Sequence, residues 1–202
     1  KKYAYVKHSS GKHISLYGDR LNRVTTFDKD DPTLHESDIP PMTRFLVDQY
    51  TDSDEASTGH RVMFFDIEVE VTDGFPDVQK AYNPITSIAL YDCMTEKYFT
   101  YCFDPHKRIE SYEKDNEVVE FYETEYEMLN QFFQKYLEIR PTIISGWNSE
   151  FFDIPYLYNR AVRVLGPELA NLLSPISQVI YSEYKKKHTI AGVSSLDYLQ
   201  LY

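Results

Sequence analysis

One short stretch, residues 62–68, constrains this chain more than any other, because an apolar run closes there on the triplet Asp66-Ile67-Glu68. The run predicts a buried β-strand, and side chains two positions apart on a strand point to the same face. Asp66 and Glu68 therefore share a face, roughly 7 Å apart along the chain. Two neighbouring carboxylates repel each other and are costly to desolvate, and a divalent cation with oxygen ligands offsets that cost. Taken alone, the triplet fits a strand that emerges into solvent with an acidic end equally well.

The composition predicts a globular protein with one sizeable core, or one core and a small accessory lobe. The chain has 202 residues, of which 42% are hydrophobic and 15% aromatic, more than a disordered chain carries. Its formal net charge of -11 argues against a wide phosphate-coating surface, because conventional duplex-binding domains are basic. A metal-dependent site that admits a few nucleotides remains compatible, because bound cations reverse the local field.

The two cysteines, Cys93 and Cys102, are too few for a disulfide framework. We expect them to be reduced core thiols in a reducing compartment, the cytoplasm (that of the host cell if the source is viral). No run of about 18 apolar residues occurs, so no membrane-spanning helix is expected. The chain begins at Lys1 without an initiator Met, and we expect it to be a piece of a longer protein.

The stretch 51–59, Thr-Asp-Ser-Asp-Glu-Ala-Ser-Thr-Gly, is a linker by composition. We therefore divide the chain into residues 1–60, which are polar and irregular with a short helix near 41–49, and residues 61–202. The second part predicts an α/β or α+β layer with a mixed sheet. Its expected elements are antiparallel strands at 62–70, 85–91 and 98–103, a solvated acidic loop at 110–122, a helix at 124–138 opened by a capping box, a short strand at 142–145, a helix opened by Asp153, and a hairpin at 179–190.

A second polar cluster, Gly-Trp-Asn-Ser-Glu-Phe-Phe-Asp at residues 146–153, lies where the short strand meets a helix. Functional residues often gather at such junctions outside strand ends. Taken alone, the cluster also fits ordinary structural roles, with Asp153 as an N-cap, Asn148 as a turn residue and Trp147 as a core side chain.

Together, the two clusters resemble the exonuclease motifs of family B DNA polymerases. Asp66-Ile67-Glu68 resembles the first motif, and Asn148 through Asp153 resembles the second, an Asn followed by an aromatic residue and an Asp. The resemblance covers residues 60–202 well and the first 60 residues loosely. Three further segments are similar to tailed-phage replicative polymerases: Asp73-Gly74-Phe75-Pro76, residues 145–160 and Ser194-Ser195-Leu196-Asp197-Tyr198.

The resemblance implies a ribonuclease H-like fold, a mixed central sheet flanked by helices and truncated at its C-terminus. It also implies a 3′-5′ proofreading exonuclease that hydrolyses the 3′-terminal phosphodiester of single-stranded DNA. By motif position, Asp66, Glu68 and Asp153 would be catalytic and would ligate two Mg²⁺ or Mn²⁺ ions. The family's third motif, a Tyr and an Asp, does not follow Asp153, so we expect the fourth carboxylate outside this chain. Residues 61–202 would then be an incomplete exonuclease domain that cleaves poorly or not at all by itself, and residues 1–60 part of the polymerase N-terminal domain and linker.

The same resemblance implies contacts to the single strand. Phe75 would pack on unpaired bases, although a loop-anchoring role fits this residue as well, and Asn148 and Phe152 would contact the strand near its 3′ end.

Three lysines, Lys185, Lys186 and Lys187, lie at the tip of the predicted hairpin. The segment resembles a hairpin that helps part primer from template in phage relatives, and the lysines could contact phosphate there. A solvated turn explains them equally well.

The implied partners are a primer–template with a single-stranded 3′ end, the rest of the polymerase and, through the missing parts, a sliding clamp; no membrane is implied. Two alternatives remain. One is a free-standing exoribonuclease of the same carboxylate superfamily, and the other is a non-catalytic single-stranded nucleic-acid-binding fragment whose first 60 residues contact RNA.

Overall fold

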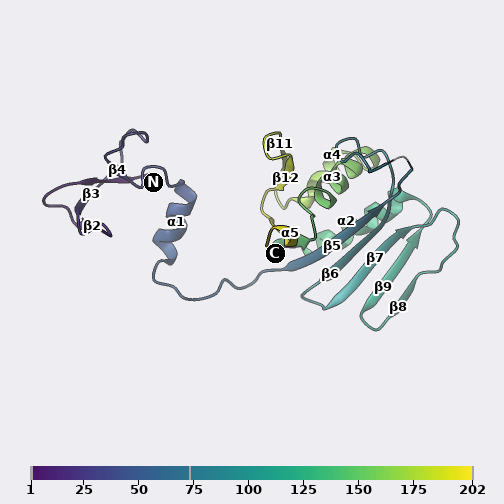
Figure 1. Cartoon of the computed structure of the whole chain (residues 1–202). Coiled ribbons are helices and arrows are strands. Elements are labelled where there is room, and N and C mark those ends of the chain that lie inside the picture. The colour runs from purple at the N-terminus through teal and green to yellow at the C-terminus, as the bar shows by residue number, and fades with distance from the viewer. Residues whose placement is uncertain (1, 73, 202) are drawn as a thin grey trace. The chain divides into compact units, whose positions relative to one another are not determined.

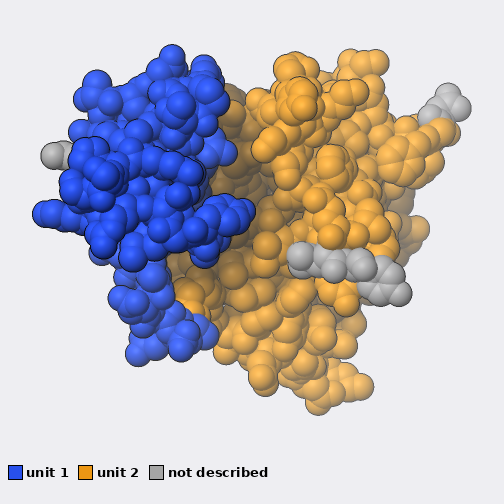
Figure 2. All heavy atoms as spheres, turned by 60° about the vertical axis from the view of Figure 1, so that its left-hand side comes forward, with its two compact units in different colours: residues 1–56 blue, residues 57–202 orange. Residues whose placement is uncertain are grey.

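The structure is a computed structural model that describes residues 2–72 and 74–201. Contacts divide the chain into two compact units, residues 1–56 and residues 57–202, which Figure 2 shows in different colours. The division falls within the linker expected at residues 51–59. Asp73, which the sequence places in the Asp-Gly-Phe-Pro segment, lies outside the described residues.

The first unit combines an antiparallel sheet, in strand order β2-β3-β1-β4, with one helix. The helix is attached through a polar contact: the buried guanidinium of Arg44 lies 4.2 Å from the ring centroid of Tyr3, and the Tyr3 hydroxyl donates to Asp48 at 2.7 Å. The elements of this unit are β1 (Ala4–Lys7), β2 (His13–Ile14), β3 (Arg20–Val24), β4 (Leu34–His35) and α1 (Pro41–Tyr50).

The second unit is built on a mixed sheet with the strand order β13-β10-β5-β6-β7-β9-β8. Figure 1 shows the part of this order from β5 to β8. Strands β13, β10 and β5 are parallel, whereas β5, β6 and β7 form the predicted antiparallel meander. The predicted fold class is confirmed. The strands are β5 (Val62–Val69), β6 (Ile85–Asp92), β7 (Lys97–Phe103), β8 (Tyr112–Lys114), β9 (Glu117–Tyr122), β10 (Ile143–Gly146) and β13 (Ser194–Asp197).

The expectation of a solvated loop at residues 110–122 is wrong, because β8 and β9 occupy this segment. Strand β9 pairs in parallel with β7, from Tyr98 opposite Glu117 to Phe103 opposite Tyr122. Val118 and Val119 favour a strand and are half-buried. The strand preference of these valines and the pairing of β9 with β7 outweigh the acidic composition from which the loop was predicted.

Helices α2 and α3 cover one face of this sheet. Helix α2 begins where the capping box predicts, with the Glu127 N–H donating to the Thr124 hydroxyl at 3.2 Å. The helical segments of the second unit are α2 (Glu125–Ile139), α3 (Asp153–Val164), α4 (Pro167–Ala170), the 3-10 turn η1 (Asn171–Leu173) and α5 (Tyr198–Leu201).

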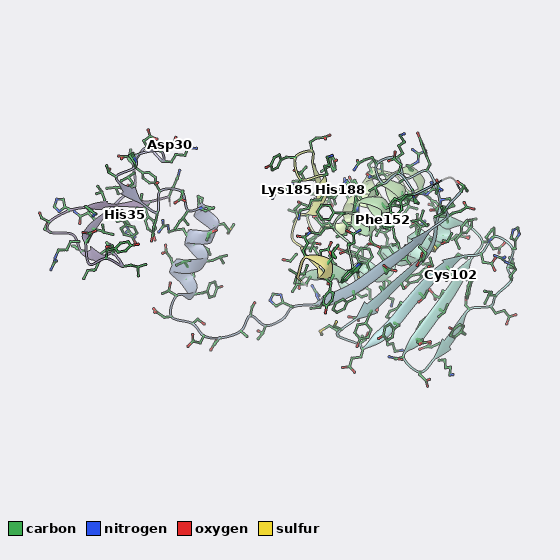
Figure 3. All side chains as sticks on the ribbon, viewed as in Figure 1. Asp30, His35, Cys102, Phe152, Lys185 and His188 are labelled. Carbon is green, nitrogen blue, oxygen red and sulfur yellow. The ribbon has the colours of Figure 1, made fainter. Side chains whose placement is uncertain are left out.

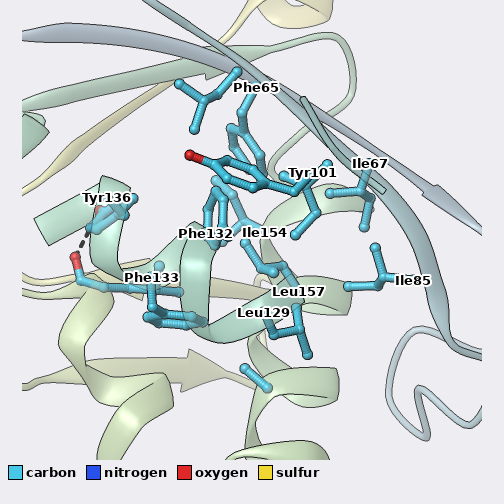
Figure 4. Packing of buried hydrophobic residues seen from close by; sticks show 14 of the residues in the cluster. Phe65, Ile67, Ile85, Tyr101, Leu129, Phe132, Phe133, Tyr136, Ile154 and Leu157 are labelled. Carbon is cyan, nitrogen blue, oxygen red and sulfur yellow. Dashed lines mark hydrogen bonds between the residues drawn. The ribbon is translucent and has the colours of Figure 1, made fainter. Parts of the chain in front are cut away.

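The core forms between these helices and the buried face of β5 (Figure 4). Phe65 and Ile67 point from the strand towards Phe132 of α2 and Ile154 of α3, all at most 5% exposed. Burial of each such side chain contributes about 1.5–3 kcal/mol. Alternation along β5 therefore places Asp66 and Glu68 on the opposite, exposed face.

A buried ion pair joins α2 to α3. The carboxylate of Glu125 accepts from the backbone N–H of Ile85 and from Nε of Arg160, both at 2.8 Å. The same guanidinium donates to the carbonyl oxygens of Ala81 and Tyr82. The pair thereby fixes the start of α2, the middle of α3 and the chain entering β6 against one another.

Candidate active site

Asp66 and Glu68 lie on one face of β5, as the sequence predicts. Both are exposed and alternate with the buried residues Phe65 and Ile67. The ladder with β6 shifts register between Glu68 and Val69. The carboxylates thus lie towards the end of a well-packed strand, on a rigid support.

Asp153 reaches the same strand from the first turn of α3. Strand β10 pairs with β5 only at Val62, Met63 and Phe64, so the edge of β5 beyond that point has donors without ladder partners in β10. Asp153 Oδ1 accepts one of them, the N–H of Ile67, at 3.1 Å. The expectation that Asp153 caps its helix is wrong: Asp153 is the first helical residue, Phe152 occupies the N-cap position without a side-chain capping bond, and the carboxylate serves β5 instead.

The local electrostatics disfavour a charge on Asp153. The side chain is 3% exposed, and this burial is the main reason why the pKa of Asp153 rises to about 7. The Ile67 N–H opposes that rise, and the negative charges of Asp66 and Asp197 add to it. Asp66 of β5, Asp153 of α3 and Asp197 of β13 therefore belong to one electrostatic environment at this end of the sheet.

This pKa predicts a pH dependence of stability in chelator-treated protein. Because the folded-state pKa of about 7 exceeds the reference value of 3.8, stability from this group is complete below about pH 4 and is lost as pH rises to 7. The loss is on the order of 4 kcal/mol. Urea unfolding at several pH values should therefore show a steeper fall for the wild type than for Asp153→Asn. Asp77→Asn serves as the control, because backbone N–H groups lower the pKa of the Asp77 carboxyl. This variant should show the same fall in stability with pH as the wild type. Equal falls in the wild type and in Asp153→Asn would contradict the prediction.

The donor set suits a hard divalent cation, although the described residues do not complete a metal site. Carboxylate oxygens are the ligands that Mg²⁺ and Mn²⁺ prefer, and a cation would offset both the burial of the Asp153 carboxylate and its repulsion by Asp66 and Asp197. Among residues 2–72 and 74–201, however, no three His, Cys, Asp or Glu side chains are arranged to hold a metal ion. Asp153 is turned to the strand edge, while Asp66 and Glu68 face solvent. The observed set is therefore a partial one that needs a cation and further ligands to close.

The turn between β10 and α3 brings the second polar cluster to the carboxylates. A Cβ on Gly146 would lie 2.6 Å from the carbonyl oxygen of Phe65, so only glycine allows this close approach to β5. Asn148 adopts a left-handed conformation, with φ of 57°. Asn148 and the two motif carboxylates of β5 are thus brought to the same end of the sheet.

One buried carboxylate in this region, Asp197, was not predicted as a site residue. It ends β13, opposite Gly146 of β10, and accepts the backbone N–H of Asn148 at 2.9 Å. The sequence shows the Ser-Leu-Asp segment but not its pairing with β10. An acidic residue at the carboxyl end of a short strand was the available signal.

Phe75 and Phe152 lie together. Their ring centroids are 5.2 Å apart, and the ring of Tyr156 lies 5.6 Å from that of Phe152. Phe75 is 81% exposed, which leaves most of its ring accessible to a ligand. The ring of Tyr156 is fully buried and packs behind that of Phe152. The aromatic surface therefore consists of Phe75 and the half-buried Phe152, and it leads from a loop after β5 to the start of α3.

The predicted hairpin is confirmed as β11 (Val179–Ser182) and β12 (Lys187–Ile190) (Figure 3). Lys185 and Lys186 are exposed in its turn. Lys187 differs, because its ammonium group pairs with the buried carboxylate of Glu150. His188 is buried between the rings of Tyr158 and Tyr181, which anchors β12 to α3.

A cavity of about 510 Å³ lies elsewhere in the second unit, and Arg61, Arg140 and Thr142 are among its lining residues. Arg61 and Thr142 directly precede β5 and β10, so the cavity lies at the opposite ends of these strands from the carboxylates. None of the predicted site residues lines it. We place the candidate site at the carboxylates, where charge, burial and main-chain geometry coincide.

Both cysteines are free thiols, and none of the described helices has the length and apolar character needed to span a bilayer.

Residues 42–202 match the family described as DNA polymerase family B, exonuclease domain. The chain is 33% identical over 171 residues to a DNA-directed DNA polymerase of Escherichia phage RB69, an alignment that covers 70% of this chain and 19% of that relative. It is 32% identical over 165 residues to a DNA-directed DNA polymerase of Enterobacteria phage T4, with 67% of this chain and 18% of the relative covered. A DNA polymerase 1 of Saccharolobus solfataricus is 30% identical over 131 residues, covering 65% of this chain and 13% of the relative. The chain thus spans less than a fifth of the length of these relatives.

Proposed function

This chain belongs to the exonuclease domain family of the family B DNA polymerases, and we propose that it is the 3′-5′ proofreading part of such a polymerase. It would hydrolyse the 3′-terminal phosphodiester of single-stranded DNA. One observation carries the proposal: the buried carboxylate of Asp153 is bonded to the strand that presents Asp66 and Glu68. Such a gathering of like charges has a high electrostatic cost, and a nuclease metal site is a function that accounts for it.

In this proposal Asp66, Glu68 and Asp153 hold Mg²⁺ or Mn²⁺ together with a further carboxylate from outside the described residues. When bound, a pair of such ions lowers the pKa of an attacking water and stabilises the leaving 3′ oxygen. The strand fixes Asp66 and Glu68, and the Ile67 N–H fixes Asp153. These residues would thereby offer the metal ions a preset anionic ligand set, so little reorganisation would be needed at the moment of reaction.

The turn and the aromatic surface would bind the single strand. Asn148 and Phe152 would lie against the 3′-terminal nucleotides, and Phe75 would stack on an unpaired base. Lys185 and Lys186 in the hairpin turn would contact phosphate, whereas the ammonium of Lys187 is already paired with Glu150. Recognition of this kind reads backbone and base faces, so sequence specificity should be low.

We predict that Phe75→Ala weakens binding of a fluorescent single-stranded DNA oligonucleotide by about tenfold, because base stacking on an aromatic side chain contributes about 1–3 kcal/mol. Anisotropy titrations in chelator would measure the dissociation constant without cleavage. Phe45→Ala, which removes an exposed aromatic ring from α1, serves as the matched control and should bind like the wild type. Equal affinities of the wild type and Phe75→Ala would assign this ring to loop packing alone.

The proposal is tested by 3′ excision from matched oligonucleotides. The polymerase that contains this chain should remove nucleotides from single-stranded DNA and from a mismatched primer end, with Mg²⁺ or Mn²⁺ required. Faster excision from the matching RNA strand would favour a free-standing exoribonuclease. Calorimetric titration of the metal distinguishes the non-catalytic alternative, because a simple binding module should show no heat that depends on Asp66 and Asp153. A sliding clamp stays a prediction.

A further inference from the structure

A buried carboxylate, Asp197, lies beside the proposed site with every polar bond directed to the main chain. It is 3% exposed. Its Oδ1 accepts the N–H of Asn148 at 2.9 Å and that of Leu199 at 3.0 Å, and its Oδ2 accepts the N–H of Glu150 at 3.0 Å. Both oxygens are therefore engaged, and hydrogen bonds to an ionised acceptor are roughly twice as strong as neutral ones.

The sheet explains how Asp197 reaches this turn. Strands β13 and β10 run parallel, with Leu196 opposite Ser145 and Asp197 opposite Gly146. The hydroxyl of Ser145 also donates to the carbonyl oxygen of Leu196 at 2.7 Å. The carboxyl ends of the two strands thus meet, and the turn that leaves β10 folds over the side chain that ends β13.

The turn held by Asp197 is one that depends on outside support. Asn148 has a φ of 57°, in the left-handed region that most residues other than glycine avoid. Asp197 binds the N–H of Asn148 itself and the N–H two residues later, so it fixes both ends of the irregular segment. Phe152 directly precedes α3, so the turn that Asp197 fixes also determines the position of Phe152.

A second set of contacts supports the same turn from the other side. Glu150, 8% exposed, accepts from Lys187 of the hairpin and from the side-chain amide of Gln200 in α5. The rings of Trp147 and Tyr198 lie 6.1 Å apart. Asp197 is thus the central member of a group of contacts that joins β13 and α5 to the turn.

We propose that Asp197 is a positioning residue of the exonuclease site, which fixes the turn that presents Asn148 and Phe152 to the 3′-terminal nucleotides. The inference rests on the proposed function. We assign Asp197 to support of the main chain rather than to metal or proton chemistry, because all three of its hydrogen bonds come from backbone N–H groups. Loss of the carboxylate should therefore affect capture of the 3′ end more than the chemical step.

Steady-state excision of single-stranded DNA by the polymerase that contains this chain tests the proposal. Asp197→Ala should raise KM about tenfold and change kcat by less than about threefold, as expected when binding is lost and the reacting groups remain. Asp197→Asn keeps one acceptor oxygen but places an amide N–H towards a backbone N–H, so its KM should be intermediate. Polymerisation should be unchanged in both variants.

The single tryptophan of this chain provides a readout independent of activity when the 202-residue chain is measured by itself. Trp147 lies in the turn and is 55% exposed, so Asp197→Ala should change its emission chiefly by lowering the anisotropy, with a smaller change for Asp197→Asn. Asp104→Ala is the matched control: Asp104 is a buried aspartate after β7 that accepts the N–H groups of His106, Arg108 and Ile109. Its loss should lower stability while KM and Trp147 emission remain those of the wild type.

The proposal would be overturned if Asp197→Ala kept the KM and the Trp147 emission of the wild type. It would also be overturned if Asp104→Ala showed the raised KM and altered emission expected of Asp197→Ala, since these changes would then follow from lost stability alone. If Asp197→Ala does not fold by circular dichroism, Asp197→Asn decides by the same two measurements. The proposed function is judged separately with Asp66→Ala. Abolished excision in that variant, together with an unaffected Asp197→Ala, would reject the positioning role and leave the nuclease assignment in place.

Discussion

Replacement of Asp66 by alanine should abolish 3′ excision by the polymerase that contains this chain while leaving polymerisation intact. Asp66 is exposed on a strand whose buried face packs into the core, so its removal should not disturb folding. It also contributes to the raised pKa of Asp153, which places the two carboxylates in one electrostatic site. We expect excision to fall by at least about a thousandfold, because loss of a metal ligand removes both activation of water and stabilisation of the leaving oxygen.

The measurement is removal of nucleotides from a 5′-labelled primer with a mismatched 3′ end, in parallel with primer extension on the same template. Glu117→Ala provides the control, since Glu117 is also an exposed strand carboxylate but belongs to β9, beyond β6 and β7. It should excise at the wild-type rate. Unchanged excision in Asp66→Ala would refute the role of Asp66, and parallel loss of extension would point to misfolding.

The largest expected effect on stability comes from Glu125→Ala. This substitution leaves the guanidinium of Arg160 buried without its partner carboxylate and leaves the N–H of Ile85 without its acceptor. The side chains of Arg160 and Glu125 are only 14% and 9% exposed, so solvent cannot replace these bonds. Removal of one partner from a buried pair costs about 3–5 kcal/mol, a large part of the total stability of a typical domain.

Thermal and urea unfolding followed by circular dichroism would measure this loss, which corresponds to a decrease in Tm of roughly 10 °C. Glu138→Ala removes a glutamate from an exposed pair with Lys135 on the same helix, and its effect should stay within about 0.5 kcal/mol. Glu125→Gln retains an acceptor for Ile85 and should be intermediate. A loss for Glu125→Ala no larger than that for Glu138→Ala would show that the pair contributes little.

Local patterns predicted the elements that depend on neighbouring residues. The alternation around Asp66 and Glu68 gave the correct face of β5, and the Thr124–Glu127 capping box gave the start of α2. The hairpin at residues 179–190 likewise has the predicted position. In each case the deciding interactions lie within a few positions of one another, so the sequence displays them directly.

Features that depend on distant pairing could not be predicted in this way. Asp153 looked like a helix cap because nothing near it reveals that β10 stops short and leaves the Ile67 N–H available. The role of Asp197 depends on the pairing of β13 with β10, about fifty residues away. The strands β8 and β9 were obscured by their acidic residues, because the parallel pairing of Val118 and Val119 with Phe99 and Thr100 of β7 cannot be read from local composition.

The hydrogen bond between Asp153 and Ile67 also has a consequence for folding, because it spans 86 positions of the chain. Such a contact forms only after the entropy of closing a long loop has been overcome, and contacts of this range form slowly. The acidic cluster is therefore assembled only once β5, β10 and α3 have docked. A nascent or partly unfolded chain would lack the arrangement needed for cleavage, so degradative chemistry would be confined to molecules that have completed their folding.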